Sequence, residues 1–207
     1  MHISNSGRVS IESTVILHNH ARLGGGASFV GQSNTSSGVE MSNCLVTDNH
    51  ARNAGGGLAV GNNLRLHDSV FTNNRVLSDS EGGGGIYIYA NKAFVNLENS
   101  AGLGAGVCVN APGTVVEVVN TVMKKNSAFL INVNDAVLTD VATGGGMFIS
   151  GHEFSVSLTH CLFSHNTGSS GGAVGFGSTA VPLSLLGTTI RIEKSVFPRH
   201  DTDWKVM

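Results

Sequence analysis

Charged residues are scarce in this chain of 207 residues. Lys, Arg, Asp and Glu make up 13% of it, against about 25% in ordinary soluble domains. The net charge is −2 and the basic residues are scattered singly, which excludes the basic stripe of a nucleic-acid-binding protein. No apolar run reaches the roughly 18 residues of a membrane-spanning helix, and the first residues show no signal peptide. Disorder is also disfavoured, because 41% of the residues are hydrophobic.

Glycine, in contrast, is abundant, with 28 residues arranged in recurring clusters. Each of six clusters is followed at once by a short apolar stretch in which buried and exposed positions are expected to alternate. The six segments are 24–29 (GGGASF), 55–60 (GGGLAV), 83–88 (GGGIYI), 104–109 (GAGVCV), 144–149 (GGGMFI) and 171–176 (GGAVGF).

A second signal precedes most of these clusters, an apolar residue three places before an asparagine. An apolar residue also stands eight places before the asparagine, and a small one five places before it. A partial seventh copy contains Ile192, Ser195 and Phe197. Two signals that recur in the same order indicate stacked repeats. The apolar–asparagine pairs are Ile16/Asn19, Val46/Asn49, Phe71/Asn74, Met123/Asn126 and Phe163/Asn166.

The repeat predicts a right-handed parallel β-helix of about six to seven coils. Short strands separated by turns and repeating every 25 to 30 residues have no helical period, and the Asn-Gly and Asp-Gly turns of hairpins are absent. A β-sandwich is the alternative fold. In a parallel stack, equivalent residues recur about 4.8 Å apart. We therefore expect the asparagines to form an amide ladder and to adopt the left-handed backbone of a corner, and the glycines to allow close turns.

The whole chain, residues 1–207, is expected to form one domain. Residues 129–143 are predicted to be a loop inserted at a corner, and residues 198–207 a tail outside the repeats. The weak copy near Leu97 fills the gap of 52 residues between Asn74 and Asn126. Because the first residues resemble the segment that follows a glycine cluster, we expect an excerpt of a longer solenoid, or ends covered by end-to-end self-association.

The three cysteines form no CxxC pair and have no metal-ligand spacing. Cys44 and Cys161 occupy the small position of the repeat, where Ser69 stands in another copy, while Cys108 lies in a strand after a glycine cluster. In a stack, Cys44 and Cys161 lie several coils apart, whereas a disulfide requires Cα atoms within about 7 Å. These two cysteines are predicted to be free thiols with inward-pointing side chains.

The pairing of FxxN with GGA and an aliphatic residue resembles the repeat of the chlamydial polymorphic outer membrane proteins and of similar large proteins in eukaryotic microbes. The motif is matched letter for letter at residues 71–74 (FTNN), 163–166 (FSHN) and 171–174 (GGAV), and more loosely over residues 9–197. The resemblance implies a β-helical passenger displayed on a cell surface and used in adhesion. It also implies an extracellular or cell-surface location and a carbohydrate or protein ligand.

The alternative function is a carbohydrate-active β-helix enzyme, a polysaccharide lyase or glycoside hydrolase. Such chemistry requires carboxylates clustered on one sheet. In the repeat register Asp48 is flanked by His18 and Asn73, and Asp68 by Ser13 and Asn43, so the carboxylates do not stack. Asp79 and Glu81 are interpreted as a solvated pair in a turn. No catalytic residue, cofactor or metal site is predicted, so we expect a non-enzymatic adhesion or display scaffold.

One basic arrangement is also present, in which the triplet His-Ala-Arg occurs twice in consecutive coils. His20 and Arg22 recur as His50 and Arg52, with His18 close by. A functional interpretation is a patch that binds an anion or a divalent metal. However, stacked like charges repel and no carboxylate completes a metal triad, so copying of a repeat also explains the identity.

Overall fold

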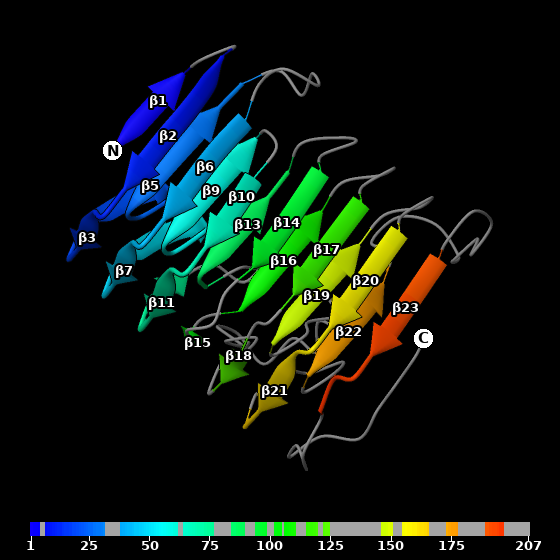
Figure 1. The fold of residues 1–207 in the computed structure, drawn as a ribbon. Coiled ribbons are helices and arrows are strands. Elements are labelled where there is room, and N and C mark those ends of the chain that lie inside the picture. The colour runs from blue at the N-terminus through cyan, green and yellow to red at the C-terminus, as the bar shows by residue number, and fades with distance from the viewer. Residues whose placement is uncertain are drawn as a thin grey trace.

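The computed structural model describes residues 1–4, 7–31, 38–61, 64–76, 84–89, 94–98, 102–104, 106–110, 115–119, 122–124, 146–150, 155–165, 173–177 and 189–196. In these residues every regular element is a β-strand, and the strands stack in parallel into four sheets (Figure 1). The predicted class, an all-β parallel solenoid, is confirmed. The predicted loop at 129–143, the tail at 198–207 and the pair Asp79 and Glu81 lie outside the described residues.

Two sheets, called A and B, each contain seven described strands and form the long walls of the solenoid. Sheet A consists of β1 (His2–Ser4), β5 (Ala27–Val30), β9 (Leu58–Gly61), β13 (Ile86–Ile88), β16 (Val107–Asn110), β19 (Met147–Ser150) and β22 (Val174–Gly177). Sheet B consists of β2 (Arg8–Glu12), β6 (Gly38–Ser42), β10 (Leu64–His67), β14 (Phe94–Glu98), β17 (Val115–Val119), β20 (Ser155–Thr159) and β23 (Thr189–Glu193).

Two smaller sheets, C and D, complete the cross-section. Sheet C consists of β3 (Val15–Leu17), β7 (Leu45–Thr47), β11 (Val70–Thr72), β15 (Gly102–Gly104), β18 (Val122–Lys124) and β21 (Leu162–Ser164). Sheet D consists of β4 (His20–Leu23), β8 (His50–Ala54) and β12 (Arg75–Val76). The first coil thus runs from β2 in sheet B through β3 and β4 to β5 in sheet A.

The strand register follows the repeat found in the sequence. In sheet B, Ile11 pairs with Met41, which pairs with Leu66. Leu66 in turn pairs with Leu97, so the weak copy forms a real coil. The inward side chains of sheets A, B and C make one core, whose largest fully buried members include Phe71, Phe163, Met41, Leu58, Leu64, Leu66, Ile86 and Ile88.

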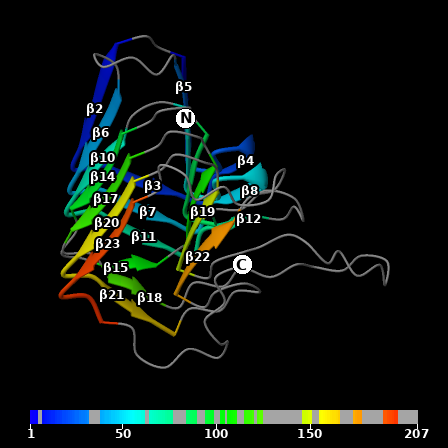
Figure 2. The ribbon, with the colours of Figure 1, turned by 90° about the vertical axis from the view of Figure 1, so that its right-hand side faces the viewer.

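Sheet A differs from the expected strand with one buried face. Its outward residues Ser28, Ala59 and Tyr87 are buried as well as its inward ones. Figure 2 shows the cause, because sheet D lies outside sheet A, on the side away from sheet B. Leu23 and Ala54 of sheet D pack there against Tyr87. The alternating pattern of the sheet A strands therefore did not mean that their outward face is exposed to solvent.

In the described part of the chain, sheet D contains one strand from each of the first three coils. The fourth coil has a shorter connection between sheet C and sheet A. In the third coil, Phe71 of sheet C and Ile86 of sheet A are fifteen positions apart, and the residues between them include β12. In the fourth coil the equivalent residues are Leu103 and Val107, only four apart. Gly106 stands where the repeat asparagine would be, so the chain passes from sheet C to sheet A without the outward excursion.

The corners of the coils correct one expectation about the repeat asparagines. Asn19, Asn49 and Asn74 do not adopt the left-handed backbone, which belongs instead to the residue before each of them. Asn, Asp and His are the non-glycine residues that tolerate this region best. Two columns of corner residues share positive φ, His18, Asp48, Asn73 and His165 in one and Ser13, Asn43, Asp68, His160 and Lys194 in the other.

Candidate functional site

The asparagine ladder is the internal framework that positions the outer surfaces. Asn49 is fully buried, and its Oδ1 accepts hydrogen bonds from the backbone N and the Nδ2 of Asn19, both at 3.0 Å. Its own Nδ2 donates to Asn74 Oδ1 at 3.0 Å and to the carbonyl of Ile16 at 2.9 Å. Asn74 continues the pattern by donating to the carbonyl of Val46. The predicted ladder is confirmed over these three coils.

A parallel column is formed by the small residues five places before each asparagine. The backbone N of Cys44 donates to Ser69 Oγ at 3.1 Å, and that of Cys161 donates to Ser195 Oγ at 3.1 Å. Cys44 and Cys161 are buried and form no disulfide, as the sequence predicted, and the same holds for Cys108. Because the thiols are enclosed, we assign these cysteines a packing role and no redox chemistry.

Two features of the glycine clusters bring sheet D close to sheet A. Gly24 and Gly55 adopt φ of 62° and 64°, which turns the chain back after β4 and β8. The next glycine then passes against the following coil without room for a side chain. A Cβ on Gly56 would lie 2.2 Å from the carbonyl oxygen of Gly84 and 2.5 Å from the backbone N of Arg75.

The outer face of sheet D carries a cluster of basic side chains, which we call the basic face: His20, Arg22, His50, Arg52 and Arg75. His20 pairs with His50 and His50 with Arg75, so these three form a column. The two imidazole rings are stacked, with centroids 4.8 Å apart and planes at 18°. Ala51, the next residue along the strand, is buried. The predicted proximity of His20 and His50 is confirmed. Arg75 was missed because the third coil has Arg-Val after Asn74 and no His-Ala-Arg triplet.

A register shift within this face separates the two triplets after their alanines. Ala21 pairs with Ala51, but Leu23 pairs with Ala54, so Arg22 lies opposite a bulge that contains Arg52 and Asn53. Arg22, Arg52 and Arg75 are all exposed. Within the described residues, no ion pair or side-chain hydrogen bond involves any of the three guanidinium groups, and His50 Nδ1 is a buried atom with no partner.

Asp48 and Asp68 lie in two different corner columns, as the register predicted. Asp48 occupies the corner column of His18 and Asn73, and Asp68 that of Ser13 and Asn43. Asp48 Oδ2 accepts a hydrogen bond from Thr47 Oγ1 at 2.7 Å. In the described part of the chain, no group of three or more His, Cys, Asp or Glu side chains is placed to hold a metal ion.

A second, apolar cluster lies between sheets D and A and holds both tyrosines of the chain. Tyr87 packs against Cys108, Ala54 and Leu23, and its ring stacks on that of Tyr89 at a centroid distance of 5.8 Å. Tyr89 lies over Gly61 of the preceding coil, where a Cβ would collide with the ring. Burial raises the pKa of the Tyr89 phenol above its ordinary value. We assign this cluster a packing role, because it joins the strands that carry the basic face to sheet A.

Sheet C exposes an apolar column that sequence reasoning missed. Val15 pairs with Leu45 and Leu45 with Val70, and near the other end Leu162 pairs with Val196. Val15 is 57% exposed, Leu45 36% and Val196 58%. The signal was an aliphatic residue four places before each repeat asparagine. Single exposed aliphatics are ordinary, so this column by itself identifies no ligand.

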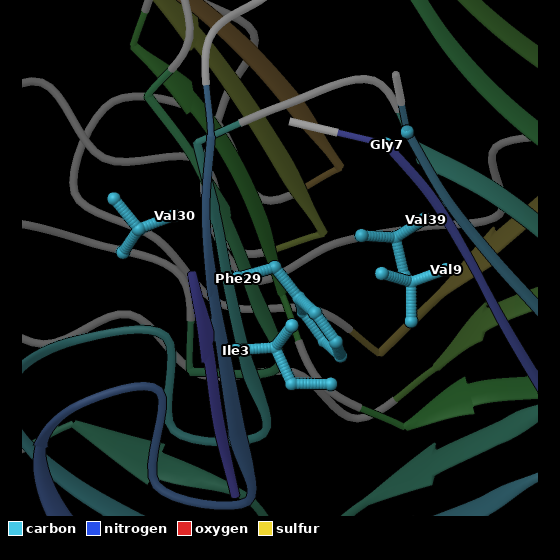
Figure 3. Close-up of a pocket in the computed structure, with 7 residues that line it drawn as sticks. Ile3, Gly7, Val9, Phe29, Val30 and Val39 are labelled. Atoms are coloured by element: carbon cyan, nitrogen blue, oxygen red, sulfur yellow. The ribbon is translucent and has the colours of Figure 1, made fainter. Parts of the chain in front are cut away.

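The first coil leaves an apolar opening at one end of the core. Figure 3 shows Ile3 and Phe29 from sheet A pointing toward Val9 and Val39 from sheet B. The hollow is small and partly open to solvent, and Gly7, Val30 and Gly38 complete its rim. These lining residues include no ionisable side chain, so the hollow offers no group for catalysis.

Fold and surface together define a parallel β-solenoid repeat protein. Residues 68–89 match the family model of the Chlamydia polymorphic membrane protein (Chlamydia_PMP) repeat. The matched segment includes β11, Asn74, β12 and β13, so the family repeat coincides with the asparagine ladder and the return strand of sheet A. The resemblance to polymorphic membrane protein repeats is confirmed. No curated protein and no solved structure matches the chain.

The matched repeat does not come from an enzyme family, and nothing in the described residues supports the carbohydrate-active alternative. In the described part of the chain, no helix is both long enough and apolar enough to span a membrane.

Proposed function

We propose that this chain is a non-enzymatic β-solenoid displayed at a cell surface, where it serves in adhesion or as a structural scaffold. The observation that supports the proposal best is the family match at residues 68–89, which falls on a coil continuous with its neighbours. A membrane-protein repeat in a rigid parallel stack fits display, because stacked coils hold side chains at fixed spacing along an extended surface.

Display is tested with antibodies raised against the folded 207-residue chain. We expect intact cells that make the protein to be labelled, and brief protease treatment of those cells to remove the label. An internal protein serves as the control for cell integrity. Labelling that requires permeabilised cells would overturn the surface location.

Adhesion is tested with beads coated with the purified chain and applied to candidate host or neighbour cells. Attachment is expected to be saturable and to be blocked by the soluble folded chain. Beads coated with a Gly56→Ala variant provide the control for folding, because that substitution places a methyl group against two backbones. Equal attachment of both bead types would contradict a role for the solenoid and favour non-specific capture.

We also propose that the open edge of the first coil binds the opposite edge of a second copy. The ladders are polar, since each coil donates N–H groups to side-chain oxygens of the next coil. At this edge Thr14 Oγ1 and Asn19 Oδ1 accept no hydrogen bond from any described residue, although both sites are used as acceptors in later coils. A coil stacked before β3 would supply the two missing donors.

Sedimentation velocity over a range of concentrations tests this association. We expect the mass of the 207-residue chain to rise with concentration, and Asn19→Lys to suppress the rise by placing a charge on the edge. Leu17→Lys is the matched control, because Leu17 is exposed on the outer face of sheet C. A monomer at all concentrations, or equal suppression by both variants, would contradict end-to-end stacking.

A further inference from the structure

The basic face combines charge and regular spacing in a way that the packing of the solenoid does not require. Three exposed guanidinium groups and two imidazoles lie on three adjacent rungs of sheet D. The inward face of the same strands is apolar, with Ala51 and Ala54 buried, and it supplies the contacts with sheet A. The outward side chains are therefore free to serve another purpose.

Within the described residues the guanidinium charges of this face are uncompensated, unlike those of Arg8 and Arg191. On sheet B, Arg8 forms an ion pair with Glu40, and Arg191 Nε donates to Glu193 Oε1 at 2.8 Å. Asp48, the acidic residue closest in sequence to the basic face, instead accepts a hydrogen bond from Thr47. Within the described residues, nothing neutralises Arg22, Arg52 or Arg75.

Like charges on neighbouring strands destabilise a sheet, and this cost disappears when an anion lies between them. A guanidinium is planar and donates two parallel hydrogen bonds to a carboxylate or to an oxyanion of similar geometry. His50 is enclosed by His20 and Arg75 in the column, with the imidazole rings 4.8 Å apart. Successive rungs therefore present N–H donors in a row along the solenoid axis.

We propose that the basic face binds a linear sulfated polysaccharide, whose sulfate and carboxylate groups contact consecutive rungs through Arg22, Arg52 and Arg75. A chain with an anionic group on each sugar unit can follow a row of this kind without being bent. The choice of a polysaccharide rests on the proposed display at a cell surface, whereas the anion site rests on the geometry of sheet D.

Two other polyanions fit the face less well. Proteins that bind single-stranded nucleic acid stack its bases on aromatic side chains, and both tyrosines lie in the cluster behind this face. Binding at a membrane surface combines basic residues with exposed apolar ones, but Ala51 and Ala54 point inward. The basic face has no exposed Phe, Tyr or Trp among its described residues, and its two imidazole rings stack on each other.

Binding of heparin oligosaccharides to the purified 207-residue chain, measured by calorimetry at several salt concentrations, tests the proposal. We expect saturable binding that weakens as salt rises. The triple variant Arg22→Gln/Arg52→Gln/Arg75→Gln is expected to bind about tenfold more weakly and to depend less on salt. Circular dichroism and thermal unfolding of the variant confirm that it remains folded.

The matched control is Arg8→Gln/Arg65→Gln/Arg191→Gln, which removes the same charge from the outer face of sheet B. It is expected to retain at least half of the wild-type affinity. Equal losses in both triple variants would show a general charge effect and overturn the site. An unchanged affinity of the first variant would overturn it as well.

Parallel titrations with unsulfated dextran, single-stranded DNA and vesicles of equal phosphatidylcholine and phosphatidylserine distinguish the ligand classes. We expect heparin to bind more tightly than all three. Tighter binding of DNA or vesicles, lost in the first variant, would contradict the polysaccharide. These outcomes are independent of surface labelling on cells, so a failure of the site and a failure of display are told apart.

Discussion

Asn49 shows how a single side chain connects three coils. Its amide accepts from Asn19 and donates to Asn74 and to the carbonyl of Ile16, and no part of it is exposed. Truncation to alanine leaves the amide of Asn74 and the carbonyl of Ile16 without these hydrogen bonds, and both residues are buried. Because an unsatisfied buried polar group costs about 1–3 kcal/mol, we expect Asn49→Ala to lower the free energy of unfolding by about 3 kcal/mol.

Urea unfolding followed by circular dichroism measures this loss. Asn19→Ala is the matched control, because Asn19 is exposed and occupies the end of the same ladder. Its expected cost is about 1 kcal/mol or less, since water replaces the lost partner. Equal destabilisation by the two variants would mean that the ladder contributes no more inside the stack than at its edge.

Tyr89 provides a residue-scale prediction about pH. Burial raises the pKa of its phenol, so the folded protein disfavours the phenolate. The stabilising contribution of the neutral phenol is complete below the unfolded pKa of about 10, and it is lost as the pH rises through the higher folded value.

The variant Tyr87→Phe leaves Tyr89 as the single tyrosine, since the chain has two. Spectrophotometric titration of its phenolate absorbance is expected to give a midpoint above 10 in the folded protein. The same titration in denaturant is expected to give the ordinary value near 10. A folded midpoint at or below the denatured one would contradict the burial of this ring.

At the scale of elements, the passage from sheet D to sheet A depends on a backbone without side chains. At Gly56 a methyl group would overlap the carbonyl of Gly84 and the backbone of Arg75 in the next coil, and backbone cannot give way as a flexible side chain can. We expect Gly56→Ala to destabilise the protein by about 3 kcal/mol or more, or to prevent folding.

Soluble yield and thermal unfolding measure the effect of Gly56→Ala. Gly84→Ala serves as the control in the same pair of coils, because among the described residues the nearest atom to its Cβ would be the carbonyl oxygen of Asn74, at 3.2 Å. That variant is expected to remain folded, with a loss of about 1 kcal/mol. If the two alanines cost the same, the tight passage at Gly56 is not what limits the stacking of these coils.

The strands and their register could be predicted because each repeat position has one environment in every coil. The apolar residue at Phe71, the small one at Ser69 and the amide at Asn74 each face a copy of themselves or a close substitute. Sheet D was not predicted as a sheet, because the His-Ala-Arg triplet that β4 and β8 share has no counterpart in β12, where the chain reads Arg-Val. The left-handed corners were assigned to the wrong residue, since asparagine itself tolerates this region and recurs next to the corner, whereas the residue that adopts it varies (His18, Asp48, Asn73).

At the scale of the whole molecule, the composition of two exposed surfaces follows from contacts that sequence patterns do not encode. The identical triplets placed His20 beside His50, but only the shared register with β12 adds Arg75 to that column. The apolar column through Val15 and Leu45 depends on which side of β3 and β7 faces solvent. The identity of an aliphatic residue in the sequence does not show which face of its strand it occupies.

Stability should vary along the solenoid axis, because each coil contacts only its neighbours. In the first coil, β2 alternates between exposed and half-buried residues. In the second coil the equivalent inward residues Val39 and Met41 are buried. We therefore expect amide hydrogen exchange in the 207-residue chain to be fast for residues 8–23 and slower for residues 38–54 and 64–76.

Exchange followed by mass spectrometry at two protein concentrations separates fraying from association. At low concentration the first coil is expected to open independently, since its edge hydrogen bonds are missing at Thr14 and Asn19. At high concentration, end-to-end stacking would slow exchange in the first coil and leave the second coil unchanged. Uniform exchange across the three segments would contradict coil-by-coil stability, because it would require the stack to open only as one cooperative unit.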